Sequence, residues 1–144
     1  MDRLPNDFVP IVFITGTYRN PRTRDDIAID TRKYTLRASR RLKRHISPEI
    51  GYKEFDNSHF HMTLFSNNPK VTDADIKLLQ SKELWGFGRI EAERWTNMGG
   101  LHYTLKHKSI PMVGEVFCPC QKRSCRKNRC KYQIEQRRPK NTER

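Results

Sequence analysis

The chain has 144 residues, a formal net charge of +13 and a sequence pI of about 10.0. This length suffices for one domain with a buried core, and the charge favours a polyanionic partner, most simply nucleic acid. The sequence contains no long apolar run and no signal-peptide pattern, which argues against a membrane span or export, so we expect a soluble intracellular protein.

The first element that we expect is a strand over residues 11–19, IVFITGTYR, because its first four residues are apolar and mostly β-branched. Alternation along a strand places Thr15 and Thr17 on one face near its end. The pair Asn20-Pro21 then predicts that the strand stops there.

Residues 25–46 carry apolar side chains at helical spacing and predict the longest helix. Seven Lys or Arg and no acid lie between Thr31 and His45. Such a face is either simply solvated or binds phosphate groups, and the absence of any balancing acid favours phosphate contact. The expected DNA contacts on this helix are Arg37, Arg40, Arg41 and Arg44.

The stretch GYKEFDNSHFHMTLF, residues 51–65, predicts two strands joined by a two-residue turn at Asp56-Asn57. On the second strand His59 and His61 point to the same face. The apolar residues between and after them point to the opposite face, toward the core. Two imidazoles side by side on a rigid strand can hold one divalent cation.

The predicted turn would place Glu54 beside His59 and Tyr52 beside His61, since opposed residues of an antiparallel pair share a face. We therefore expect a metal site formed by His59, His61 and Glu54. The carboxylate favours Mg²⁺ or Mn²⁺, whereas imidazoles alone would favour Zn²⁺. A longer loop would bring Glu49 to the histidines instead, and the sequence leaves this alternative open.

The rest of the chain predicts a helix capped by Thr72, a strand over residues 87–95, a helix over 101–108 and a last strand over 110–117. On the third of these elements Tyr103 and Lys106 share a face. The whole order predicts an α+β fold, an antiparallel sheet with helices on one side in a ferredoxin-like arrangement.

We expect this domain to span residues 1–117, followed by a basic tail over 118–144 that is disordered or binds zinc. The tail contains ten Lys or Arg and two Glu, a net +8 of the total +13. It also contains every cysteine of the chain, in the pattern Cys-x-Cys-x4-Cys-x4-Cys, which departs from the usual zinc-knuckle spacing. The candidate zinc ligands are Cys118, Cys120, Cys125 and Cys130.

Three motifs in this order resemble the HUH endonucleases that initiate rolling-circle replication. The similarity is to the replication-initiator (Rep) branch, including the proteins of small single-stranded DNA phages and viruses. The matching stretches are FITGTYR at 13–19, HFHMTLF at 59–65 and YTLK at 103–106, and WGFGRIEAE at 85–93 is also similar to phage members. Together they cover roughly residues 11–110.

The resemblance implies a metal-dependent endonuclease and strand transferase acting on single-stranded DNA at a replication origin. His59 and His61 would bind Mg²⁺ or Mn²⁺. Tyr103 would attack a phosphodiester to leave a 5′-phosphotyrosyl link, and Lys106 would hold phosphate or stabilise developing charge. The sequence has no P-loop, so we expect a host helicase and polymerase as partners. The expected location is the cytoplasm of a bacterial or archaeal host, or the nucleus if the source is a eukaryotic virus.

Two other functions remain open at this stage. A single-tyrosine transposase would use the same chemistry, but such proteins tend to carry Tyr-x-x-x-Gln where this chain has Tyr-x-x-Lys at 103–106. A basic nucleic-acid-binding protein without catalysis would need only the charge and the cysteine tail. A covalent DNA adduct separates both enzymes from the binding protein.

Overall fold

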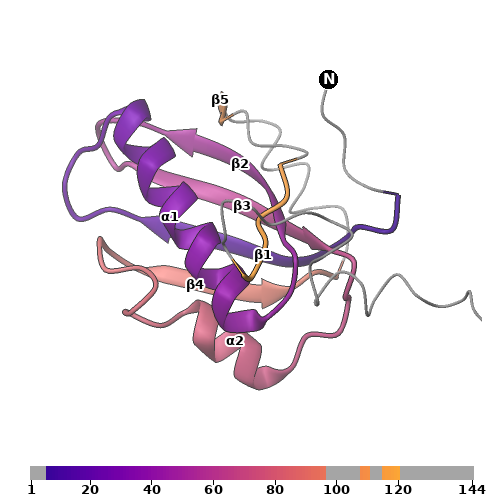
Figure 1. The fold of residues 1–144 in the computed structure, drawn as a ribbon. Coiled ribbons are helices and arrows are strands. Elements are labelled where there is room, and N and C mark those ends of the chain that lie inside the picture. Colours follow the sequence, from indigo (N-terminus) through magenta and orange to yellow (C-terminus); the bar gives the residue numbers. More distant parts are fainter. Residues whose placement is uncertain (1–5, 97–107, 111–114, 121–144) are drawn as a thin grey trace, which may run out of the picture.

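The computed structural model describes residues 6–96, 108–110 and 115–120 of the chain. Within these ranges the protein is an α+β fold, a five-stranded antiparallel sheet with two helices (Figure 1). The strands are β1 (Val9–Thr17), β2 (Ser47–Lys53), β3 (His59–Ser66), β4 (Ile90–Arg94) and β5 (Lys108–Ile110). The helices are α1 (Arg24–Leu42) and α2 (Asp73–Leu79). The predicted α+β class and antiparallel sheet are confirmed.

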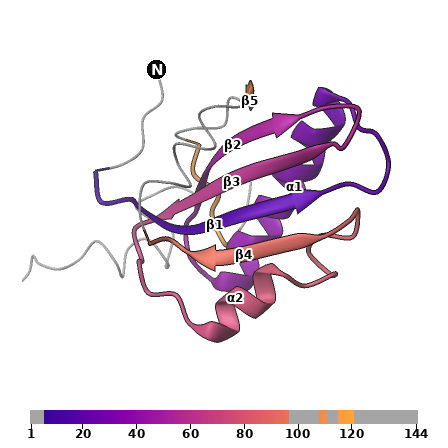
Figure 2. The same cartoon turned by 180° about the vertical axis from the view of Figure 1, so that it is seen from behind.

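The strand order in the sheet is β4-β1-β3-β2-β5, and every neighbouring pair is antiparallel. The connection through α1 therefore passes over β3, and the connection through α2 passes over β1. Both helices lie on the same side of the sheet (Figure 1), and Figure 2 shows the opposite side, which neither of them covers. No helix in the described ranges is long and apolar enough to span a membrane.

The core lies between the sheet and the helices, where alternate strand residues are apolar. Phe60, Met62 and Leu64 of β3 are fully buried, as is Tyr34 of α1. Burying such side chains contributes roughly 1.5–3 kcal/mol each. The hydroxyl of Thr35 lies 3.9 Å from the sulfur of Met62, so the even-numbered residues of β3 face α1. The odd-numbered residues, among them both histidines, face the side without helices.

The helix α1 is shorter than predicted at its C-terminal end. It begins after Thr23, whose hydroxyl accepts a hydrogen bond from the Asp26 N–H. It ends at Leu42 because Lys43 adopts a left-handed conformation, φ 58°, and its N–H bonds to the Ser39 carbonyl. The predicted helical residues 43–46 therefore lie outside the helix.

The predicted cap of the second helix is confirmed. Thr72 accepts a hydrogen bond from the Asp75 N–H, and the Asp75 carboxylate accepts one from the Thr72 N–H in return. This reciprocal capping satisfies two donors that a helix start leaves without partners. The helix α2 then packs against α1, where the Tyr34 hydroxyl donates to the Leu79 carbonyl at 2.7 Å.

The last part of the domain differs from the prediction in its boundaries. Lys108, predicted to end a helix, belongs instead to β5. The predicted strand over 110–117 is represented by Ile110 in β5 and by Phe117, which forms an isolated bridge to Ile46. Both backbone hydrogen bonds of that bridge are present, at 2.7 and 3.1 Å.

Candidate functional site

The side of the sheet opposite the helices carries both histidines, and we call it the histidine face. The strand registers place Glu91, Thr15, His61, Gly51 and Ser109 in one row across the five strands. Because directly opposed residues share a face, these side chains all belong to the histidine face. Four of these five residues are polar, and the register places them side by side across the sheet. Figure 2 views this side of the sheet.

His59 lies at the start of β3, opposite Thr17 on one side and Lys53 on the other. Its Nδ1 is 2.8 Å from the carbonyl oxygen of Asn57. Since a carbonyl can only accept, Nδ1 must carry the proton, and the lone pair of a neutral ring is on Nε2. Metal-binding histidines are commonly oriented by such a bond from their other nitrogen.

His61 is more enclosed, with 5% of its surface exposed. Its Nδ1 shares a hydrogen bond of 3.2 Å with the Thr15 hydroxyl, and its ring is stacked on Phe13 with centroids 5.7 Å apart. The ring centroids of His59 and His61 are 5.1 Å apart, in an edge-on arrangement. The two imidazoles are therefore neighbours with fixed orientations, as predicted from their spacing in the sequence.

The predicted register between β2 and β3 is wrong. Gly51, not Tyr52, lies opposite His61, and Lys53, not Glu54, lies opposite His59. The two strands are joined by the loop 54–58 rather than by a two-residue turn. A shift of one residue moves every side chain of a strand to the other face, so Tyr52 points to the core.

Glu54 is consequently held elsewhere. Its carboxylate accepts a hydrogen bond of 2.8 Å from the backbone N–H of Arg24, the first residue of α1. A negative charge at this place stabilises the start of the helix. The structure thus brings His59 and His61 together but not the carboxylate that was predicted to join them.

Glu49, the alternative ligand, does share the histidine face. It pairs with Thr63 in the register, one position along β3 from His61 on the same face. Its Oε1 is buried without a hydrogen-bond partner in the described part of the chain, and so is the Thr63 hydroxyl. Burial raises the pKa of Glu49. An unsatisfied buried carboxylate oxygen is costly and is expected where a ligand or ion supplies the missing contact.

As the side chains are placed, residues 6–96, 108–110 and 115–120 contain no group of three His, Cys, Asp or Glu close enough to hold a metal ion. The two imidazoles fit as two ligands of one cation. Glu49 is on the same face as these imidazoles but does not form a group of three with them in this structure.

The predicted catalytic residues Tyr103 and Lys106 lie outside the described residues, and so do Cys125 and Cys130. Cys118 and Cys120 are described and half-buried, and their sulfur atoms are 3.1 Å apart. The structure therefore brings together the two predicted zinc ligands that it describes.

The predicted cationic face of α1 is partly present. Arg37, Arg40 and Arg41 are exposed, and Arg41 pairs with Glu83 at 3.2 Å. Exposed pairs of this kind contribute little to stability and leave the arginine able to exchange partners. These three side chains remain candidates for phosphate contact.

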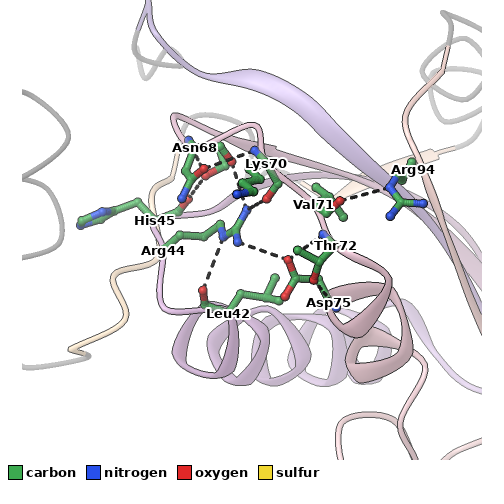
Figure 3. Close-up of polar contacts among 10 residues, drawn as sticks. Leu42, Arg44, His45, Asn68, Lys70, Val71, Thr72, Asp75 and Arg94 are labelled. Carbon is green, nitrogen blue, oxygen red and sulfur yellow. Dashed lines mark hydrogen bonds and ion pairs between the residues drawn. The ribbon is translucent and has the colours of Figure 1, made fainter.

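Arg44 does not belong to this face. It follows the helix and is 8% exposed, with its guanidinium directed into the fold (Figure 3). It donates to the carbonyls of Asn68 and Lys70, and it pairs with Asp75 at 3.3 Å. Burial lowers the pKa of Arg44, and the Asp75 carboxylate opposes that shift. The contacts show a structural role that the charge pattern alone could not reveal.

Sequence reasoning also missed two exposed aromatic side chains in the loops at this end of the sheet, Phe55 and Phe87, which are 57% and 42% exposed. Neither lies in a strand or helix, so no periodicity marks them. A comparison of the chain with protein-family models, with curated proteins and with solved structures finds no significant match.

Proposed function

We propose that this protein nicks and rejoins single-stranded DNA through a covalent tyrosine intermediate, as a replication initiator of the HUH type. The observation that supports this proposal most is the pair of oriented imidazoles, His59 and His61, on the histidine face. The order strand, helix, strand, strand, helix, strand with the sheet order β4-β1-β3-β2 also agrees with a ferredoxin-like arrangement.

The described tyrosines support Tyr103 as the nucleophile by elimination. The chain has five tyrosines, and three of them are buried in the described part. Burial raises the pKa of Tyr18 and of Tyr34, and the Asp30 carboxylate raises that of Tyr18 further. Tyr52 is 5% exposed and faces the core. A nucleophilic phenolate needs access and a lowered pKa, so Tyr103 and Tyr132 remain, and of these two only Tyr103 has a lysine three residues on.

Covalent geometry permits Tyr103 to reach the histidines. Five peptide units separate it from Lys108, so its Cα cannot be more than about 18 Å from that residue. Lys108 is the first residue of β5, paired with Tyr52 at the edge of the sheet. Two strand spacings, roughly 10 Å, separate β5 from β3. The tether therefore permits the tyrosine to reach the histidine face.

The donor set of the histidine face suits a divalent cation. His59 and His61 would supply two nitrogen ligands. The buried Glu49 oxygen, which has no hydrogen-bond partner in the described residues, is the best candidate for a third ligand. A bound cation would polarise the phosphorus and neutralise charge on the phosphate oxygens. The carboxylate favours Mg²⁺ or Mn²⁺.

In the reaction the Tyr103 oxygen attacks the phosphorus and the bond to the 3′ oxygen breaks. The phenol loses its proton, the departing 3′ oxygen gains one, and the 5′ phosphate stays on the tyrosine. The ammonium of Lys106, three residues on, would stabilise the charge that develops on the phosphate. Because the phosphotyrosine link conserves the energy of the broken bond, attack by a 3′ hydroxyl reverses the step without ATP.

The proposal is tested by incubating the protein with labelled single-stranded DNA pools and Mn²⁺, followed by denaturing electrophoresis. We expect a metal-dependent covalent band that is lost in Tyr103→Phe and in His61→Ala. Tyr52→Phe is the matched control, because it removes a hydroxyl on the core side of the sheet, and it should form the adduct normally. An adduct that persists in Tyr103→Phe would refute the assignment of the nucleophile.

If no adduct forms on random pools or on the origin of the cognate replicon, the protein binds nucleic acid without nicking it. Folding of each variant is checked by circular dichroism, so that a lost band reports on chemistry. The same assay with Glu49→Gln and Glu54→Gln separates the two candidate carboxylates. We expect only the first to weaken the metal dependence, because Glu54 is held at the start of α1.

A further inference from the structure

Three loops meet at the end of the sheet where His59 lies, at the left of Figure 1 and the right of Figure 2. We call residues 18–24, 54–58 and 86–89 the loop platform. Backbone hydrogen bonds join its members, from Tyr18 N–H to Ser58, from Arg19 N–H to Phe87 and from Phe55 N–H to Arg22, at 2.8–3.1 Å. The three loops therefore form one connected surface.

Phe87 is exposed and yet held in place. Its ring contacts Trp85 edge-on with centroids 5.1 Å apart and Tyr18 at 5.7 Å, and the Arg22 guanidinium lies 5.2 Å from its centroid. Even so, 42% of the side chain remains accessible. An aromatic ring that is fixed before binding can stack on a ligand with little loss of conformational freedom.

Phe55 is the most exposed large apolar residue of the described part, at 57%. Its backbone is in the left-handed region, φ 66°, which costs a bulky residue energy that the fold must supply elsewhere. Its N–H donates to the Arg22 carbonyl, and its carbonyl accepts from the Ser58 hydroxyl. The loop therefore holds an apolar ring in water in a strained conformation, which neither core packing nor solubility explains.

The charge around these rings favours phosphate. The loop platform contains four arginines and two acids, and one of the acids, Glu54, accepts from the Arg24 N–H. Within the described residues, Arg24 and Arg89 form ion pairs with exposed carboxylates, at 3.5 and 3.7 Å, and such contacts are readily exchanged. Proteins bind single-stranded nucleic acids by stacking aromatic rings on unpaired bases and by placing cationic side chains near the phosphates. The loop platform offers both kinds of group.

We propose that the loop platform binds single-stranded DNA next to the nicking site. Phe87 and Phe55 stack on unpaired bases, and Arg24 and Arg89 contact the phosphates. The position beside the nicking site rests on the proposed function. The register supports it, because Thr17 pairs with His59 and the next residue, Tyr18, bonds to the loop that precedes His59.

The test is fluorescence anisotropy with single-stranded DNA in EDTA, so that binding is measured without cleavage. We expect Phe87→Ala and Phe55→Ala each to weaken binding about 5- to 150-fold, the equivalent of one lost base stack. Phe87→Tyr should retain wild-type affinity, because its ring still stacks. Phe87→Leu, which keeps apolar bulk and protects the fold, should be as weak as Phe87→Ala.

Ile29→Ala is the matched control, since this residue is a 52% exposed apolar residue of α1 that is not part of the platform, and the change should leave affinity unaltered. Duplex DNA should bind more weakly and respond to none of the phenylalanine substitutions. Wild-type affinity for single-stranded DNA in both alanine variants would overturn the proposal, and so would tighter binding to single-stranded RNA of the same sequence.

The two proposals fail separately in this design. If the phenylalanine variants lose affinity but wild type forms no covalent adduct on its own origin, DNA binding by the platform is supported and the nicking function is refuted. If wild type forms the adduct and the alanine variants bind DNA as tightly as wild type does, the nicking function is supported and DNA binding by the platform is refuted.

Discussion

Replacing Arg44 tests whether the basic residues after α1 serve the fold or a ligand. The side chain of Arg44 is 9% exposed and that of its partner Asp75 is 21% exposed. Hydrogen bonds to charged groups contribute about 1.5–3 kcal/mol each, and removing one member of a buried pair costs about 3–5 kcal/mol. Because Asp75 keeps some contact with water, we expect Arg44→Ala to lose about 2–4 kcal/mol of unfolding free energy.

The measurement is urea unfolding followed by tryptophan fluorescence, for which Trp85 is a core reporter at 1% exposure. Arg41→Ala is the control, because its pair with Glu83 has side chains 47% and 73% exposed. Loss of such a pair costs at most about 1 kcal/mol. Arg44→Lys should fall between wild type and Arg44→Ala, since a lysine keeps the charge but not the fork of donors. Equal stabilities for the Arg41 and Arg44 alanine variants would refute the reasoning.

Three further outcomes follow from single side chains. Gly16→Ala should cost about 1–3 kcal/mol in urea unfolding, because a Cβ there would lie 2.2 Å from the Phe60 ring, and unchanged stability would contradict that packing. Thr72→Ala should cost about 1 kcal/mol by losing the cap of α2, whereas Thr72→Ser should not. Burial raises the pKa of Glu49 above the ordinary 4.5, so the folded protein holds this proton more tightly; the resulting stability is fully present below pH 4.5 and is lost as the pH rises through the raised pKa. Glu49→Gln should therefore gain thermal stability relative to wild type as the pH rises above 4.5, and parallel curves would exclude the shift.

The strands and caps could be predicted because each rests on a local pattern. The alternation of apolar residues around His59 and His61 predicts that both histidines share one face of the strand. The cap of α2 depends only on the four consecutive residues from Thr72 to Asp75. The register of β2 could not be obtained from the turn alone, because Phe55 and Asn57 adopt left-handed conformations in a longer loop. A usable signal was present in Ile50 and Tyr52, whose apolar side chains must join the core, and this would have placed Glu49 on the histidine face.

Which arginines are exposed and which are held in the fold could not be predicted, because this depends on tertiary contacts. Arg32 and Arg41 form ion pairs with acids that are distant in the sequence, Glu115 and Glu83. Arg44 donates a hydrogen bond to a backbone carbonyl in the loop before α2. The sequence shows only that no acid lies between Thr31 and His45. A count of charges on one helix therefore overstates the surface that remains for a polyanion.

Arg22 links the fold to the loop platform, which explains why a buried acid is tolerated in α1. Asp30 is 7% exposed and accepts from the Tyr18 hydroxyl at 2.9 Å and from the Arg22 guanidinium at 2.7 Å. A buried carboxylate persists only where charged and hydrogen-bonding partners compensate its lost hydration. The same guanidinium lies over the Tyr18 and Phe87 rings, and the Arg22 carbonyl holds Phe55. This partly buried ion pair thus connects the segment that carries Arg22, and with it the contacts of both exposed rings, to α1.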